Sequence, residues 1–494
     1  MRSRCALVLV VPFPGTPRRR LRAPPRRAEQ GAAAGTAVSA FLSSRPRRVS
    51  RALRRAVVAL AFVLVHSTVA MAQAAPALTL EAARAAARRH SPDLVAAREM
   101  VNAARGLERQ AGAHPNPVFT FSREQASGDE QSTAQNIALL EQPLERGALR
   151  SARLDAARVR REAADVRVAI AEASLDFEVT RSYALALAAD RRAALADQAT
   201  TAFTEALRVS ARRLAAGDLS GYANRRLKLE AARYAALRAE AILARRVART
   251  ELASLVASGD DAVDASNLVL ADSLGARGAT PSGDSLLAVA LRSRGELRAA
   301  ELDALAAAAD ARLVARERTP TPVLSAGLKS ERMGVAGAPS QGLTGFVAGL
   351  SLPIPLWDRR GGAIDAADAE SRRRAAEVAG LRRRIAREIA DAYDAYRAAD
   401  AQLAMLAPQL GGESRAALGA AQVAYAEGEI TLVEWLDAVR AYREAEASFA
   451  TLQADVIIRR ATLERAVGAP LLPVTLPLNP TPGDSPATST GLDR

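Results

Sequence analysis

The sequence predicts a mainly helical protein with a small β part, built from two tandem copies of one unit. Three observations lead to this prediction. Aromatic residues make up 4% of the 494 residues, while alanine, arginine, leucine and glutamate dominate, a mixture that favours long helices over compact layered domains. Short motifs recur in the same order in both halves of the chain. In each half, a very long helical pattern follows two segments with the alternation of strands.

The positive charge is concentrated at the N-terminus. Residues 1–72 carry fourteen arginines and a single acid, Glu29, so they contribute +13 of the formal net charge of +14. A nucleic-acid-binding domain keeps a basic surface in its folded part, whereas the rest of this chain is close to neutral. The composition therefore argues against nucleic acid as a partner.

Residues 49–72 have the pattern of a secretory signal peptide. Arginines precede the apolar run 56–65, and Ala70 and Ala72 supply the small residues of a cleavage site before Gln73. Because an apolar run of this length is too short to span a bilayer, we interpret it as a signal and expect the mature protein to be exported.

Both ends of the chain differ in composition from the middle. Residues 1–48 form a low-complexity extension rich in Arg, Pro and Ala, which a start codon assigned too far upstream would explain. This extension holds the single cysteine, Cys5, so we expect no disulfide and no thiolate metal site in the mature protein. Residues 471–494 are rich in Pro, Thr, Ser and Gly and are expected to form a disordered tail.

The middle of the chain divides into two repeats, expected over 73–270 and 271–470. Self-similarity at a fixed period indicates a repeated structural unit. The matching motifs lie 205, 210 and 211 residues apart: Pro115-Asn116-Pro117-Val118 with Pro320-Thr321-Pro322-Val323, Leu154-Asp155-Ala156-Ala157 with Ile364-Asp365-Ala366-Ala367, and Ala215–Ser220 with Ala426–Thr431.

Each repeat is expected to open with a helix, over 79–113 and over 284–318, because the Pro-x-Pro that follows cannot continue it. A long helical hairpin closes each repeat. The first runs over 149–214, turns near 214–223 and returns over 221–257; the second runs from 363, turns near 425–438 and returns to Val467.

Between these helices, each repeat holds two segments that alternate like strands. The strands are expected at 117–126 and 133–142, forming a hairpin over 117–142, and at 322–331 and 343–353, forming a hairpin over 322–353 with a loop at Gly334–Gly337. Leu324, Ala326 and Leu328 would share one face of a strand. Weak alternation over about ten residues is typical of strands that face lipid, although a soluble hairpin can show it too.

Neither part is complete in a single subunit. Four strands are too few for a membrane barrel, which needs at least eight. Helical tracts of about 65 residues would be about 100 Å long and must lie against partner helices. The chain is therefore expected to oligomerise if its strands span a membrane. The alternative is a soluble periplasmic coiled-coil scaffold whose strands form surface hairpins.

This order of elements behind a signal peptide resembles the TolC-like family of outer-membrane efflux proteins, which are the outer-membrane factors of tripartite efflux pumps. The resemblance covers the mature chain to about residue 470. It implies a homotrimer in which each subunit gives four strands to a twelve-stranded β-barrel in outer-membrane lipid, above a periplasmic α-barrel of helices. The motif Pro115-Asn116-Pro117 resembles that of the metal- and multidrug-exporting branch of the family, which includes metal-efflux proteins.

The resemblance also implies partners and a passive role. A periplasmic adaptor (membrane fusion) protein and an inner-membrane proton-driven pump would complete the system, and metal cations or small toxic compounds would be exported. A type I secretion duct is the alternative within the family. The sequence has no Walker loop, no HExxH and no G-x-S-x-G, so we expect neither an enzyme nor a cofactor. Two isolated histidines, His90 and His114, predict no metal site.

Two acids stand out in the segment from Tyr425 to Ala438, which resembles the family's second periplasmic turn. Glu434 and Asp437 are three residues apart and so share one face of a helix. The resemblance implies that they form an acidic ring at a pore constriction, with Glu434 in place of the more usual aspartate. The alternative is a solvated acidic pair at a helix N-terminus, where the helix dipole favours acids.

The two turns are the other candidate sites. Glycine allows the chain to reverse without strain, and Ser or Thr can cap the returning helix. The spacing predicts a helical-hairpin turn, and the resemblance implies that the turns dock the adaptor. The residues concerned are Gly217, Asp218, Leu219 and Ser220 in the first turn and Gly428, Glu429, Ile430 and Thr431 in the second.

Overall fold

The computed structural model describes residues 77–257, 268–274, 282–408, 410 and 414–471. The N-terminal extension, the signal peptide with its cleavage residues Ala70 and Ala72, and all but the first residue of the predicted C-terminal tail lie outside the described residues. Everything below therefore concerns the two repeats.

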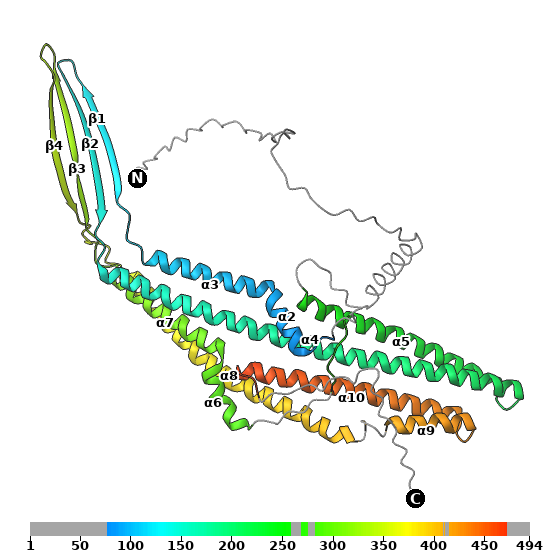
Figure 1. The fold of residues 1–494 in the computed structure, drawn as a ribbon. Coiled ribbons are helices and arrows are strands. Elements are labelled where there is room, and N and C mark those ends of the chain that lie inside the picture. Colours follow the sequence, from blue (N-terminus) through cyan, green and yellow to red (C-terminus); the bar gives the residue numbers. More distant parts are fainter. Residues whose placement is uncertain (1–76, 258–267, 275–281, 409, 411–413, 472–494) are drawn as a thin grey trace, which may run out of the picture. The chain divides into compact units, whose positions relative to one another are not determined.

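The same order of elements occurs twice along the chain (Figure 1). Residues 80–256 hold α2 (Leu80–His90), α3 (Pro92–Ala111), β1 (Val118–Ser127), β2 (Gln131–Pro143), α4 (Gly147–Ala216) and α5 (Gly221–Val256). Residues 283–467 hold α6 (Gly283–Ser293), α7 (Gly295–Arg316), β3 (Val323–Val335), β4 (Gln341–Ser351), α8 (Gly361–Pro408), α9 (Ser414–Glu427) and α10 (Leu432–Val467).

The four strands form one antiparallel sheet in the order β1-β2-β3-β4, so the two hairpins join through β2 and β3. The register aligns Phe121 with Ala138, Ala138 with Leu328, and Leu328 with Phe346. These residues therefore form one row across the sheet. Gly327 allows the strands to approach, because a Cβ there would lie 1.9 Å from the carbonyl oxygen of Ala138.

The loop of the second hairpin is shorter than predicted. β3 continues to Val335, so Gly334 and Val335, which we expected in the loop, belong to the strand. Gly337 lies in the loop with a φ of 81°, a conformation that glycine adopts without strain.

The opening helix of each repeat is broken in two. α2 ends at His90, and Ser91 caps α3 with its Oγ 3.4 Å from the N–H of Leu94. The second break lies at Arg294, between α6 and α7, and no proline in the sequence indicates it. There Ser293 Oγ donates to the carbonyl of Val467 at 2.9 Å, and Arg294 pairs with Glu388 at 2.5 Å. Tertiary contacts therefore stabilise this break.

α4 is a continuous helix of 70 residues and lies at the centre of the packing (Figure 1). Near the sheet the helices are ordered α3, α4, α7, α8, and toward the turns they are ordered α5, α4, α10, with α8 and α9 beyond. The outgoing helix of the second repeat differs from the prediction, since it ends at Pro408 and α9 begins at Ser414. Residues from α3, α5, α8 and α9 thus form the two lateral edges.

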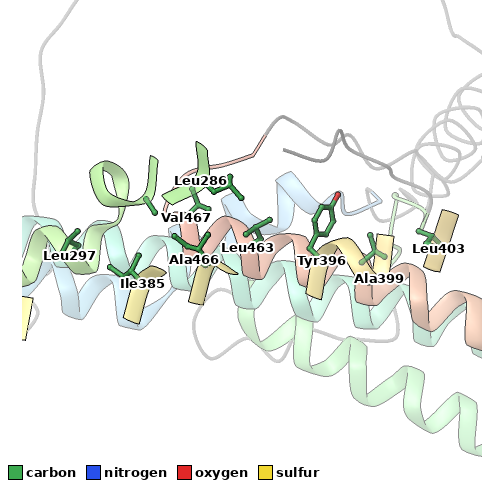
Figure 2. Close-up of a cluster of buried hydrophobic side chains, with 12 residues drawn as sticks. Leu286, Leu297, Ile385, Tyr396, Ala399, Leu403, Leu463, Ala466 and Val467 are labelled. Atoms are coloured by element: carbon green, nitrogen blue, oxygen red, sulfur yellow. The ribbon is translucent and has the colours of Figure 1, made fainter. Parts of the chain in front are cut away.

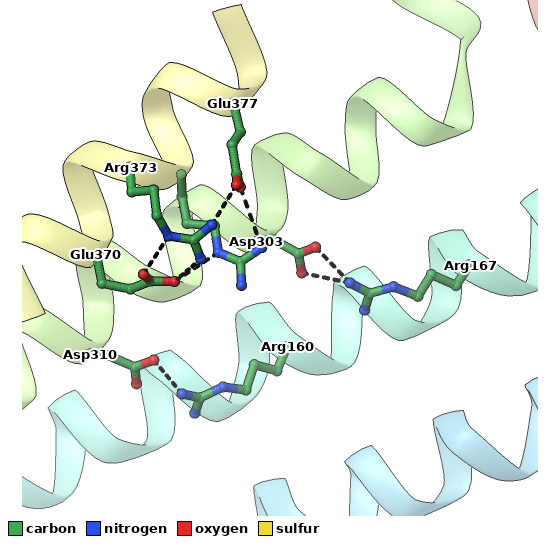
Figure 3. A network of polar contacts seen from close by, with 8 residues as sticks. Arg160, Arg167, Asp303, Asp310, Glu370, Arg373 and Glu377 are labelled. Atoms are coloured by element: carbon green, nitrogen blue, oxygen red, sulfur yellow. Dashed lines mark hydrogen bonds and ion pairs between the residues drawn. The ribbon is translucent and has the colours of Figure 1, made fainter. Parts of the chain in front are cut away.

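Apolar clusters hold these helices together. Figure 2 shows one extended cluster, which includes Leu297 of α7, Ile385 and Tyr396 of α8 and Leu463 of α10. Burial of such side chains stabilises each by about 1.5–3 kcal/mol. Partly exposed ion pairs add directional contacts between α4 and α7 (Figure 3), where Arg167 pairs with Asp303 at 2.6 Å and Arg160 pairs with Asp310. Pairs of this kind contribute only about 0–1 kcal/mol each. They therefore align α4 with α7 but add little to the stability of the fold.

The segment that links the repeats is tied down by a buried acid. Asp272 is 5% exposed and accepts hydrogen bonds from the Leu80 N–H (2.7 Å) and the Tyr183 hydroxyl (2.8 Å). Burial and this bond raise the pKa of Tyr183 above its usual value. The acid therefore satisfies an N–H at the start of α2 and holds the segment around residue 272 against α4.

Candidate functional site

The first turn joins α4 to α5. Gly217 follows the end of α4 with a φ of 84°, a left-handed conformation that costs a residue with a Cβ about 1–2 kcal/mol. The Asp218 N–H donates to the carbonyl of Arg213 at 2.9 Å, which satisfies one of the last carbonyls of the helix. The Oγ of Ser220 then accepts from the Ala223 N–H at 3.2 Å and caps α5.

The second turn joins α9 to α10 with the same left-handed glycine and a fuller cap. Gly428 has a φ of 89°. Thr431 and Glu434 form a capping box: the Thr431 N–H donates to Glu434 Oε2 at 2.7 Å, and the Glu434 N–H donates to Thr431 Oγ1 at 3.3 Å. Two otherwise unpaired donors are thereby satisfied.

The remaining turn residues divide by burial. Asp218 and Glu429 are exposed, whereas Leu219 and Ile430 are half-buried. Ile430 packs against the apolar cluster beneath the turns. The acids are thus available to a partner, while Ile430 anchors the second turn.

Arg213 connects the two turns. Its Nη2 donates to the carbonyl of Ala426 at 3.1 Å, and its guanidinium lies 5.7 Å from the ring centroid of Tyr425. A Cβ on Gly428 would lie 2.7 Å from Arg213 Nη2. The turns therefore lie side by side within one subunit. Sequence reasoning missed this role of Arg213, because its only signal was a position near the end of a helix.

An aromatic cluster lies beneath both turns. Phe203 of α4 contacts Tyr234 of α5 (ring centroids 4.4 Å apart) and the edge of Trp435 of α10 (5.0 Å). Tyr425 of α9 stacks on Trp435 at 5.3 Å. Trp435 is only 1% exposed. Such ring pairs add about 0.5–1.5 kcal/mol beyond burial, so this aromatic cluster gives the turns a rigid base.

The Tyr425 hydroxyl is the exception in this cluster. Within the described part of the chain it is buried and has no hydrogen-bond partner. Burial raises the pKa of Tyr425, and Arg213 opposes the shift. The spacing of residues in the sequence did not indicate that Tyr425 would be buried or that its hydroxyl would lack a partner.

Glu434 and Asp437 are both exposed on α10, while Trp435 and Val439 are buried beneath them. The hydrogen bonds from Thr431 lower the pKa of Glu434 below its usual value. Glu434 therefore has a local capping role in addition to any role in a pore. Among the described residues, Asp437 makes no ion pair.

A groove of about 640 Å³ lies between α4 and α9 beside the turns, with Asp197 and Glu205 among its lining residues. Each of these acids is already paired, Asp197 with Arg238 and Glu205 with Arg208. The described residues contain no cluster of three or more His, Cys, Asp or Glu that could hold a metal ion. His90 and His114 lie apart, at the end of α2 and between α3 and β1.

No helix in the described ranges is long and apolar enough to cross a bilayer.

Comparisons with known proteins agree on one family. The sequence profile of the family described as outer membrane efflux protein matches residues 286–469. The cobalt-zinc-cadmium resistance protein CzcC of Cupriavidus metallidurans is 26% identical over 401 residues, covering 80% of this chain and 91% of that protein.

Solved structures show the same fold. The outer-membrane channel OprN matches with a TM-score of 0.65 and 22% identity, covering 79% of this chain and 90% of that one. CusC, whose structures describe transmembrane channel formation, matches with a TM-score of 0.62 and 17% identity over 79% and 92% of the two chains. The resemblance expected from the repeats, the strands and the signal peptide is therefore confirmed. The second repeat therefore matches the outer membrane efflux protein family, and the chain has the fold of outer-membrane channels, with its helices extending into the periplasm.

Proposed function

We propose that this protein is the outer-membrane duct of a tripartite efflux system and passively exports metal cations. The observation that carries the proposal is the exposed apolar face of the four-stranded sheet. Phe346 and Leu350 of β4 and Leu328 of β3, which share this face, are 72%, 68% and 61% exposed. A water-soluble domain rarely exposes so large a contiguous apolar surface, whereas lipid would cover it.

The rows of this face extend over all four strands. Phe119 of β1 aligns with Leu140 of β2, and Leu324 of β3 aligns with Leu350 of β4. Trp357, just beyond β4, is 93% exposed, and aromatic residues flank the apolar band of membrane barrels. These positions support contact between the sheet and the outer-membrane lipid.

A trimer would complete both parts of the subunit. Three copies would supply twelve strands, which is enough for a closed barrel, and their helices would surround a periplasmic passage. The chain shows no nucleotide-binding motif, so the energy would come from a partner, which we propose to be a proton-driven pump in the inner membrane. A periplasmic adaptor would dock at the two turns, whose exposed Asp218 and Glu429 are free to bind it.

Three copies of Glu434 and Asp437 would form acidic rings around the threefold axis. Such rings attract cations and repel anions. The similarity to CzcC, named for cobalt, zinc and cadmium resistance, supports metal cations as the exported substrate. In the single subunit, the hydrogen bonds with Thr431 lower the pKa of Glu434 and so favour its charged form.

Single-channel recording in planar bilayers tests the channel and the rings together. The variant Glu434→Gln/Asp437→Asn removes both charges, and glutamine at 434 can still serve the capping box. We expect ion conduction to persist and block by trivalent cations to weaken at least tenfold. Glu444→Gln, an exposed acid further along α10, is the matched control and should leave the block unchanged.

If the double variant is blocked as strongly as the unchanged protein, the acidic rings are not the site of block. If the unchanged protein shows no conductance, the proposal that it is a channel is wrong. The substrate is tested separately by deleting the gene and measuring growth with cobalt, zinc or cadmium salts. Sensitivity that rises for organic toxins alone would overturn the assignment to metals.

A further inference from the structure

We propose that Arg123 of β1 and Arg332 of β3 bind the phosphate groups of an anionic lipid in the outer leaflet of the membrane. The inference rests on the proposed contact between the sheet and outer-membrane lipid, and it names the class of lipid that the sheet selects. No local pattern in the sequence indicated either arginine.

The face of the sheet that carries Phe121 changes character along the strands. The register aligns the residues of this face in rows that cross the sheet. The three rows toward α3 and α8 are mostly apolar: Gln142-Leu324-Leu350, Phe119-Leu140-Ala326-Ala348 and Phe121-Ala138-Leu328-Phe346. The three rows toward the hairpin loops are mostly polar: Arg123-Asn136-Ser330-Thr344, Gln125-Ala134-Arg332-Gly342 and Ser127-Ser132-Gly334. The change occurs at the same level on all four strands.

The charged residues of the sheet are separated by face. Within the four described strands, Arg123 and Arg332 are the only charged residues on the face with the apolar rows. The opposite face carries one positive and three negative residues, namely Lys329, Glu124, Glu141 and Glu331. The acids of the first hairpin loop, Asp129 and Glu130, lie beyond the last row. The face that would contact lipid is therefore purely basic.

Both arginines are available to a ligand. They are exposed, and in the part of the chain that the structure describes neither forms a hydrogen bond or an ion pair. On the opposite face, by contrast, Lys329 pairs with Glu331 at 3.2 Å. An arginine that faces lipid is costly at the middle of the bilayer and less so near the interface. Their position is therefore favourable only where headgroups or water can meet them.

The level of the polar rows fits the outer interface. Because the helices extend into the periplasm, the hairpin loops lie toward the outside of the cell. Arg332 is paired with Gly342, nine residues from the end of β4 at Ser351. At about 3.3 Å per residue and a tilt of about 40°, this length corresponds to about 23 Å across the membrane, close to the height of about 25 Å of the apolar band in membrane barrels. The arginines thus lie near the level at which the headgroups of the outer leaflet begin.

The spacing of the arginines suits a headgroup with two phosphates. Arg123 and Arg332 are two strands apart and two residues apart in register. With strands about 4.8 Å apart and about 3.3 Å per residue, their Cα atoms are about 12 Å apart. Each guanidinium can bind one phosphate through two parallel N–H bonds. Between them on β2 lie Asn136, whose amide can donate a further bond, and the small Ala134.

The neighbouring apolar row supplies the rest of the contact. Phe121 lies two residues before Arg123 on the same face, and Leu328 and Phe346 continue its row. The acyl chains of a lipid whose phosphates meet the arginines would lie on these side chains. Lipid A, a sugar-based lipid that carries two phosphates, has both features, whereas free phosphate lacks the chains.

Lipid retention tests this surface. The full chain is purified in a neutral detergent and incubated with lipid A, and the lipid that stays bound after gel filtration is quantified by mass spectrometry. We expect Arg123→Gln/Arg332→Gln to retain at least fivefold less lipid A, and Arg123→Lys/Arg332→Lys to retain more than the glutamine variant because the charge remains. The matched control, Lys329→Gln, removes a positive charge from the opposite face of β3 and should retain as much as the unchanged protein.

Competition distinguishes the lipid from a free anion. Inorganic phosphate should not displace lipid A, and lipid A without its phosphates should bind equally weakly to the unchanged protein and to Arg123→Gln/Arg332→Gln. Displacement by inorganic phosphate, or an equal loss of lipid A in Lys329→Gln, would overturn the inference. Equal retention of lipid A by the glutamine variant and the unchanged protein would also overturn it, while the proposed channel would stand. Release of the protein from outer membranes by carbonate would overturn both.

Discussion

The first turn, at Gly217–Ser220, and the second turn, at Gly428–Thr431, reverse the chain with the same left-handed glycine, yet they are supported differently. The first turn ends a continuous 70-residue helix and has a single serine cap. The second follows a helix of 14 residues, separated from α8, and has a full capping box. Local backbone structure thus supports the first turn, whereas the second relies more on its cap and on contacts with neighbouring helices.

The contacts that support the second turn come from both repeats. α9 and α10 meet α4 through the aromatic cluster, and Arg213 reaches across to Ala426. Further from the turn, Glu446 of α10 is 4% exposed and accepts from Arg191 of α4 and from Ser414 of α9, each at 2.7 Å. The comparison implies that substitutions should loosen the second hairpin before the first.

The largest effect is expected for Trp435→Ala. Removal of a buried tryptophan costs about 3–5 kcal/mol, and it takes away the ring on which Tyr425 stacks. Hydrogen exchange should show lower protection in α9 and in the start of α10, with α4 and α5 less affected. Val433→Ala, at an exposed neighbouring position, is the control. Equal loss of protection in both hairpins would contradict the proposed asymmetry.

The next largest loss of stability, about 2–3 kcal/mol, is expected for Glu446→Ala, because Arg191 would be left partly buried without its partner. We expect α9 to lose protection through the loss of the Ser414 bond as well. Additional replacement of Arg191 by alanine should restore part of the stability in a double-mutant cycle. A purely additive double variant would show that the pair is not coupled.

Replacement of the turn glycines separates backbone strain from contacts. Gly217→Ala should cost about 1–2 kcal/mol from the left-handed conformation alone, because a Cβ there would meet nothing within 4 Å. Gly428→Ala should cost more, since its Cβ would also displace Arg213. The rates of proteolysis at the two turns measure the difference. A larger increase in rate for Gly217→Ala than for Gly428→Ala would contradict the expectation that contacts add to the cost at the second turn.

The smallest effects concern the caps. Ser220→Ala and Thr431→Ala should each cost about 1 kcal/mol, but only the second cap should respond to pH. The pKa of Glu434 is below its ordinary 4.5 in the folded protein, so its carboxylate stabilises fully above 4.5 and less as the pH falls through the lower value. Hydrogen exchange between pH 5 and 3 should therefore show a selective loss at the second turn, absent in Thr431→Ala. A parallel loss at the first turn would argue against the capping box as its cause.

The sequence by itself predicted much of the fold. Turn glycines, Pro-x-Pro steps and alternating apolar residues act locally, so they indicated the long hairpins and all four strands to within a few residues. The strand ends were less accurate at Gly334 and Val335, where pairing with β2 extends β3 beyond the point that alternation suggested.

Among the site residues, the sequence could identify those whose role follows from a local pattern. Gly217, Gly428 and Thr431 were recognisable as turn and cap residues, and Glu434 was recognisable as an acid at a helix start. The pore role of Glu434 and Asp437 remains a prediction, because it depends on copies of the chain around a common axis.

Only the tertiary structure decided the contacts between residues that are far apart in the sequence. Three such contacts join residues more than 90 positions apart: Arg294 with Glu388 at the break between α6 and α7, Arg213 with Ala426, and Arg191 with Glu446. The periodicity of a helix indicates which face is apolar but does not identify the partner that covers it. On α5, for example, only the packing on α4 shows that Leu227 and Leu252 are buried while Leu229 and Leu243 are exposed.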